Sequence, residues 1–233
     1  MNDSQIPSLD PTSTGGRWSV DADTPLQSVL ERPDTPALLH QTLTGTISWQ
    51  ARNQTPVRRA LTSPRIAPRW VAALLALGAT VAVEGNAGRA EEVPLEVMLQ
   101  RKARGTVSAL HVPRGDVKWG GAHVARTPTD EPIVAAVAVV ETEGSVVAQA
   151  RVALIGSWSE PVRLAEAPAQ LVGGPLDEAH IQQVAAAVEK EVAPRGDFLG
   201  SEAYRRAVAR VLTRRALEQC LLQEAEYEQR RGL

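Results

Sequence analysis

The sequence is poor in cysteine: Cys220 is the single one among 233 residues. One thiol excludes an internal disulfide framework, and it excludes any metal or iron–sulfur site built from cysteines of this chain alone. The histidines are equally uninformative, because they lie far apart and form no pair one helical turn apart. The sequence therefore predicts no catalytic or metal role for His40, His111, His123 and His180.

An excess of charge of one sign is also lacking. Lysine and arginine number 25 and aspartate and glutamate 27, for a formal net charge of −2. This balance gives no sign of nucleic acid or an anionic membrane as a partner. The longest uncharged apolar run, residues 70–83, is about 14 residues long, too short to span a bilayer. With no signal-like segment at its start, the sequence predicts a cytoplasmic protein.

Aromatic residues make up 3% of the sequence, so alanine and valine must supply most of the core. Residues 1–17 have little to bury and are expected to form a disordered tail. Residues 23–43 predict two short helices, because Thr24-Pro25 and Thr35-Pro36 are typical helix starts. Residues 45–68 are expected to be irregular and polar.

Further along, a helix is expected to end at Gly78, with a strand over 80–83 and a short helix from Pro94. Four strands then follow in "TVSALHVP", "VKWGGAHVA", "EPIVAAVAVVETEG" and "SVVAQARVALIGS". Two helices close the chain, over 177–192 and about 201–230. We expect Tyr204, Val208, Val211 and Leu212 to form the buried stripe of the last helix, and its arginines to form either a solvated face or a docking surface for a partner. Strands followed by helices favour an α+β fold with helices on one face of an antiparallel sheet.

Four segments in this order carry a family resemblance: "VPLEVML", "ALHVP", "RVALIGSWSEPVRLAEAPAQLVGGPLDEAHI" and "GDFLGSEAYRRAVARVLTRRAL". Together they resemble the flavoprotein (medium) subunit of the molybdenum hydroxylases, a group that includes carbon monoxide dehydrogenase, xanthine dehydrogenase and 4-hydroxybenzoyl-CoA reductase. The last segment is the most specific, because an amphipathic helix alone would not reproduce its ordered polar residues: Asp197, Ser201, Tyr204, Arg205, Arg206 and Arg215.

The resemblance implies a domain plan. Residues 18–103 would be a truncated remnant of the FAD-binding domain (PCMH type), and 104–220 a CO dehydrogenase flavoprotein C-terminal-like domain. Residues 221–233 would be a helical tail. The stretch 53–61 resembles the insertion of the 4-hydroxybenzoyl-CoA reductase type, but without the cysteines that hold an extra iron–sulfur cluster there.

The resemblance also locates a candidate FAD site. In the family two glycine-rich loops hold the FAD pyrophosphate, since bare backbone lets several N–H groups approach a phosphate closely. The first loop has no counterpart here. In the second, Thr46 and Ile47 match the family's Thr-Ile-Gly-Gly-Asn, but Ser48, Trp49 and Gln50 replace Gly-Gly-Asn. Thr46, Ile47, Ser48 and Gln50 therefore form either a remaining flavin loop or an ordinary turn.

A further family position, an acidic residue, corresponds to Arg69, whose charge is opposite. Arg69 is either a solvated residue ahead of a helix or a bidentate partner for a phosphate.

By resemblance the function is that of a medium subunit in an oxidoreductase complex. In such complexes FAD passes electrons from the iron–sulfur clusters of a small subunit to an outside acceptor, while a molybdenum-cofactor large subunit transforms the substrate. The chain is then either an FAD-dependent electron-transfer subunit with a degraded flavin site, or a non-catalytic docking subunit that no longer binds FAD. A non-functional gene remnant is the third interpretation.

Overall fold

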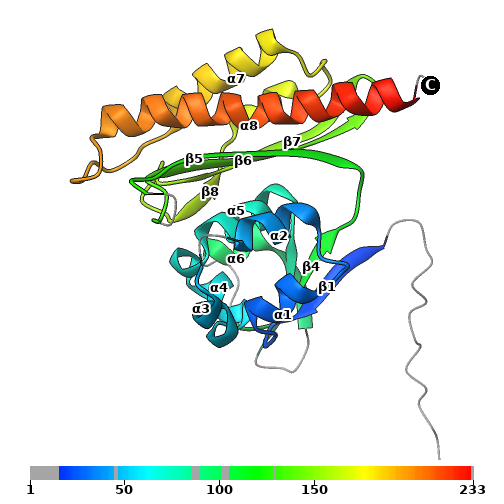
Figure 1. Ribbon diagram of the computed structural model, residues 1–233, viewed down its shortest axis with the longest axis vertical. Coiled ribbons are helices and arrows are strands. Elements are labelled where there is room, and N and C mark those ends of the chain that lie inside the picture. Colours follow the sequence, from blue (N-terminus) through cyan, green and yellow to red (C-terminus); the bar gives the residue numbers. More distant parts are fainter. Residues whose placement is uncertain (1–15, 45–46, 86–89, 101–104, 128–129, 232–233) are drawn as a thin grey trace, which may run out of the picture.

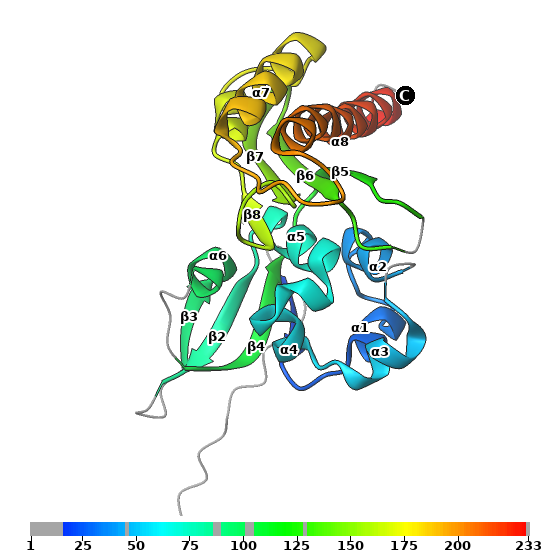
Figure 2. The ribbon, with the colours of Figure 1, turned by 90° about the vertical axis from the view of Figure 1, so that its left-hand side faces the viewer.

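The structure is a computed structural model that describes residues 16–44, 47–85, 90–100, 105–127 and 130–231, with side chains up to residue 225. Two four-stranded antiparallel sheets organise it (Figures 1 and 2). The first has the order β1-β4-β2-β3 and the second β5-β6-β7-β8. The α+β class expected from the sequence is confirmed.

The first sheet joins strands that are distant in the sequence. Its members are β1 (Arg17–Asp21), β2 (Thr80–Glu84), β3 (Ala90–Pro94) and β4 (Thr106–Pro113). The sequence analysis missed β1 and β3, and it assigned residues 106–113 to the second unit. In the structure β4 pairs with both β1 and β2, so this strand lies in the first sheet. Arg17 begins β1, and the expected disordered tail otherwise falls outside the described residues.

Short helices cover the first sheet: α1 (Leu26–Glu31), α2 (Ala37–Leu43), α3 (Trp49–Gln54), α4 (Val57–Thr62), α5 (Pro68–Ala76) and α6 (Leu95–Leu99). The two helices expected over 23–43 are present as α1 and α2. Residues 45–68, expected to be irregular, contain α3, α4 and a 3-10 turn (Pro64–Ile66) instead. Pro56 caps the start of α4, and Pro68 is the first residue of α5, where the preset φ of proline suits a helix.

The second sheet contains β5 (Val117–Val124), β6 (Val134–Glu143), β7 (Val146–Ile155) and β8 (Val162–Leu164). A 3-10 turn (Ala167–Leu171) follows, then α7 (Glu178–Glu191) and α8 (Glu202–Arg231). Both long helices cover the outer face, while α5 packs against the inner face (Figure 2). The last three of the four strands expected in the second half are β5, β6 and β7.

Strand β6 connects the two hydrophobic clusters of the molecule. Its residues 134–140 are all buried, and successive side chains of a strand point to opposite faces. Ala135, Val137 and Val139 join the cluster around α5, whereas Val134 and Ala136 join the cluster under α7 and α8. This double burial explains why the β6 sequence is continuously apolar rather than alternating.

Helix α8 lies along β5 and covers the outer edge of the second sheet. The Gln219 side chain exchanges hydrogen bonds with the Gly121 backbone at 2.8 and 3.3 Å. The Gln223 side chain does the same with the Trp119 backbone, at 3.1 and 2.8 Å. Two glutamine side chains thus take the place of a neighbouring strand, which protects an edge that could otherwise pair with another chain.

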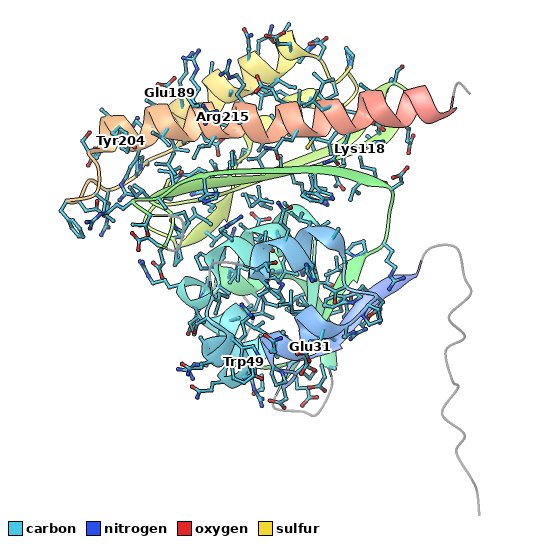
Figure 3. The ribbon with its side chains drawn as sticks, in the orientation of Figure 1. Glu31, Trp49, Lys118, Glu189, Tyr204 and Arg215 are labelled. Carbon is cyan, nitrogen blue, oxygen red and sulfur yellow. The ribbon has the colours of Figure 1, made fainter. Side chains whose placement is uncertain are left out.

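The buried face of α8 differs from the expected stripe. Leu212 is buried, but Tyr204 is 42% and Val211 38% exposed, and Figure 3 shows Tyr204 near the start of the helix. The buried residues of α8 are Arg205, Ala209, Leu212, Thr213, Ala216, Leu217, Cys220 and Glu224, and Val208 is half-buried against the same cluster. The expectation was wrong for Tyr204 and Val211, because the apolar pattern did not show that Arg205 and Ala209 occupy the core face at the start of the helix.

Arg205 also contradicts the expectation that the arginines of α8 lie on a solvated face. It is 5% exposed and donates to the Ile133 carbonyl at 2.7 Å. Its other guanidinium nitrogen donates to both Asp197 carboxylate oxygens, at 2.8 and 2.7 Å. Asp197 also accepts the Leu199 backbone N–H at 2.8 Å. Arg205 therefore connects the turn ahead of α8, through its ion pair, to the residue just before β6, through its hydrogen bond.

This ion pair predicts a specific loss of stability in acid. The Arg205 hydrogen bonds, followed by the Leu199 N–H, hold the pKa of Asp197 below its usual value. A folded-state pKa below the unfolded one stabilises the fold above the unfolded pKa, about 4, and this contribution is lost as pH falls through the folded pKa. We expect Asp197→Asn to shrink the loss of stability between pH 7 and about pH 3, measured as urea midpoints.

The matched control is Glu166→Gln, which removes the carboxylate of an exposed pair with Arg163 at 3.7 Å. This variant should keep the wild-type acid profile, since exposed pairs contribute little. Identical profiles for wild type and Asp197→Asn would contradict the role assigned to Asp197.

Candidate functional site

The segment compared with the flavin loop begins helix α3. Thr46 lies outside the described residues. Ile47 is 8% exposed and packs into the core around α5. Ser48 is the N-cap of α3, and its hydroxyl accepts the Ala51 backbone N–H at 3.2 Å. The sequence thus folds locally as a capped helix, as serine before a helical turn favours.

The polar groups around the start of α3 already form hydrogen bonds with other groups of the chain. Arg52 donates its backbone N–H to the Ser48 carbonyl at 2.9 Å, and its guanidinium donates to the Ile47 carbonyl. The same guanidinium donates to the Gln27 amide oxygen on α1 at 2.8 Å. The Arg52 side chain, which was not a candidate in the sequence, therefore connects the segment to α1.

Two side chains of the segment point to solvent. Gln50 is exposed, and the Trp49 indole is 62% exposed at the surface of the α3 region (Figure 3). Ile47, Ser48 and Gln50 are neighbours along one turn but do not surround a common cavity. Their assignment to a cofactor stays a prediction.

Arg69 lies elsewhere, in the first turn of α5, and is half-buried. It lines a cavity of about 20 Å³ together with His123 of β5 and Gln41 of α2. From the sequence, His123 was expected to have no catalytic or metal role and was not paired with Arg69, because their proximity depends on the packing of α5 against the second sheet. No local spacing encodes such a contact.

The roomiest described cavity, about 860 Å³, lies between α4, α6 and the segment around β8. Its walls are mainly apolar, with Leu61, Leu75, Val83, Met98, Val107 and Leu164 among them. None of Ile47, Ser48, Gln50 and Arg69 lines it. The sequence-predicted site and this cavity are thus separate.

Cys220 is buried in α8, and burial raises the pKa of its thiol to about 12. A protonated thiol is a poor nucleophile, which fits the expected packing role. Across the described ranges, no three histidine, cysteine, aspartate or glutamate side chains gather as a metal ion would need. No described helix is both long and apolar enough to cross a membrane.

With the geometry in view, the comparisons can be stated. Residues 122–220 match the family model of the CO dehydrogenase flavoprotein C-terminal domain. This part of the chain is therefore similar to that domain. The matched region contains most of the second sheet together with α7 and the larger part of α8, including Arg205 and its partner Asp197.

Relatives extend the match beyond this domain. The glyceraldehyde dehydrogenase medium chain of Sulfolobus acidocaldarius is 24% identical over 188 residues, which are 78% of this chain and 67% of that protein. This chain is therefore related to the CO dehydrogenase flavoprotein (medium-subunit) family of molybdenum hydroxylases, as the sequence resemblance implied.

Solved structures share the fold of most of the chain. Quinoline 2-oxidoreductase from Pseudomonas putida 86 has a TM-score of 0.76 and 22% identity, covering 90% of this chain and 76% of the other. Carbon monoxide dehydrogenase from Hydrogenophaga pseudoflava also has a TM-score of 0.76 at 22% identity, covering 90% and 77%. At this identity the likeness establishes the fold alone.

Proposed function

We propose that this chain is a docking subunit of a molybdenum hydroxylase-type complex and that it does not hold FAD in the segment 46–50. One observation carries the proposal: a capped helix start occupies the place where the family resemblance puts a glycine-rich pyrophosphate loop. The region that matches the CO dehydrogenase flavoprotein C-terminal domain is, in contrast, densely packed around its own hydrophobic cluster.

The described residues of the segment do not fit a pyrophosphate. A diphosphate needs several free backbone N–H groups at close range. Here the Ser48 hydroxyl takes the Ala51 N–H, and residues 47–50 all carry side chains where glycine would leave the backbone bare. Helix α3, Trp49–Gln54, is also short, so its dipole offers little. Desolvating a phosphate without such donors costs several kcal/mol.

The partners in this proposal are a molybdenum-cofactor large subunit and a two-cluster iron–sulfur small subunit, by family resemblance. Residues 53–61, compared above with the 4-hydroxybenzoyl-CoA reductase insertion, form the end of α3 and most of α4. They contain no cysteine, so we assign them a structural role. Co-expression with candidate large and small subunits, followed by co-purification, tests the docking role directly.

The proposed lack of FAD binding predicts the colour of the purified protein. The full chain, produced in flavin-replete cells, should purify without bound FAD and without a visible flavin absorption band, because the side chains of residues 47–50 crowd the backbone that a pyrophosphate would have to approach closely. A family medium subunit that keeps the Gly-Gly-Asn loop, purified in parallel, is the control.

A triple variant, Ser48→Gly with Trp49→Gly and Gln50→Asn, restores the family loop within the same chain. We expect the triple variant to bind no FAD either, because by the family resemblance two glycine-rich loops hold the pyrophosphate and the variant restores one of them. FAD bound by the triple variant alone would instead identify this loop as the sole defect. Stoichiometric FAD in the wild-type chain would overturn the proposal and favour the alternative, an FAD-dependent electron-transfer subunit.

A further inference from the structure

Arg69 is a partly buried cation without a partner. Burial lowers the pKa of its guanidinium. In the part of the chain that the structure describes, no carboxylate, carbonyl or aromatic ring pairs with it, although nearby arginines are engaged. Withdrawing a charge from water without a compensating partner is unfavourable. None of its nitrogens is among the fully buried unpaired atoms of the described residues, so the guanidinium is reached by solvent and is open to an anion from outside.

The surroundings of Arg69 supply no negative charge. Residues 35–83 contain no aspartate or glutamate, yet they contain Arg52, Arg58, Arg59, Arg65 and Arg69. Arg58 obtains an acidic partner from outside this segment, Asp23, whereas none reaches Arg69. The first turn of α5 carries no acidic residue either, so the positive end of the helix dipole adds to the charge of Arg69.

A second titratable group shares the cavity. His123 of β5 lines it opposite α5, and its pKa is lowered by burial first and by the Arg69 charge second. Among the described lining residues, contributed by α2, α5, β5 and β6, only Arg69 and His123 can carry a charge. Gln41 adds an amide group at the rim, and the Trp119 ring adds an apolar wall.

The size of the cavity limits what can enter. About 20 Å³ is room for one water-sized group. A flavin ring is far too large, whereas one oxygen of a carboxylate or phosphate group fits while the rest of the molecule stays outside. A guanidinium suits both groups, because its forked N–H donors match two oxygens at once.

We propose that Arg69 and His123, with Gln41 at the rim, bind the terminal oxyanion of a ligand, a carboxylate or a phosphate group. The anion supplies the negative charge that residues 35–83 lack. It also favours the protonated form of His123, so binding strengthens as the pH falls toward the ordinary histidine range. This inference concerns a separate group of residues and does not rest on the proposed function.

Calorimetric titration of the full chain with inorganic phosphate and, separately, with succinate tests the site. We expect millimolar or tighter binding of at least one of the two, weakened at least about tenfold in Arg69→Gln. Arg69→Lys, which keeps the charge but loses the fork, should bind with intermediate strength. Arg65→Gln, which removes an exposed arginine four positions away, is the matched control and should bind like wild type.

Each outcome has a meaning. Binding of phosphate alone assigns a phosphate-bearing ligand, and binding of succinate alone a carboxylate. His123→Gln should flatten the pH dependence of binding. The proposal is overturned if neither anion binds, or if Arg69→Gln binds as well as Arg65→Gln while both variants melt like wild type.

Discussion

Gly120→Ala is expected to destabilise the protein by about 3 kcal/mol, because α8 and β5 meet at this residue with no space for a side chain. A Cβ built on Gly120 would collide with the Ala216 carbonyl oxygen and lie 2.8 Å from the Gln219 Cβ. Both obstacles belong to α8, and one is backbone that cannot rotate away. The helix would have to move outward along its contact with the sheet.

The neighbouring glycine provides a matched control. A Cβ at Gly121 would find its nearest neighbour, the Ala136 carbonyl oxygen, at 3.9 Å, which is ordinary van der Waals contact. Gly121→Ala should therefore change the free energy of unfolding by no more than about 0.5 kcal/mol. Urea unfolding of both variants measures the difference. Equal stability of the two would mean that α8 does not approach β5 as closely as the structure has it.

The displacement of α8 would extend beyond one contact. Gln219 and Gln223 bind the β5 backbone from positions one helical turn apart. Both pairs of hydrogen bonds require the short distance that Gly120 permits. An outward shift would uncover the β5 edge, and exposed strand edges promote pairing between chains. Gly120→Ala is thus expected to aggregate more readily as well as to unfold earlier.

The sequence predicted best those helices and strands whose signals lie within the element itself. The strands β6 and β7 follow from apolar runs of suitable length joined by a Glu-Gly turn, and α7 follows from its apolar spacing. The end of α5 was predicted from Gly78, which has a φ of 70°. Each of these signals lies within one element, where local conformational preference decides the structure.

The first sheet shows where such reasoning fails. Trp18 pairs with Val112 across more than ninety residues, and no local pattern specifies that register. Residues 45–68 looked irregular because they are polar and interrupted by proline, yet tertiary packing stabilises α3 and α4 there. The meeting of Arg69 with His123 belongs to the same class, since it depends on how α5 packs against β5.

Arg205 illustrates a different limit. An arginine in a charged run is usually solvated, and only its partners reveal the exception. The carbonyl of Ile133 and the carboxylate of Asp197 come from separate segments, so the burial of Arg205 between them emerges only after folding. The family resemblance identified these residues as a motif, and the structure explains them as a connection between α8, β6 and the preceding turn.

Leu212→Ala is expected to cost about 2–5 kcal/mol, because Leu212 is 1% exposed and its removal leaves a cavity under α8. Its neighbours in the cluster come from the second sheet and α7, which cannot easily collapse around the gap. Thermal or urea unfolding of the purified variant measures the loss.

Tyr204→Ala, two turns earlier on the same helix, is the control that tests the corrected face of α8. The sequence pattern places Tyr204 and Leu212 on one buried stripe and predicts similar losses for both. The structure leaves Tyr204 42% exposed, so its truncation should change the free energy of unfolding by about 1 kcal/mol or less. A loss as large as that of Leu212→Ala would return Tyr204 to the core and show that the start of α8 is rotated from the orientation described.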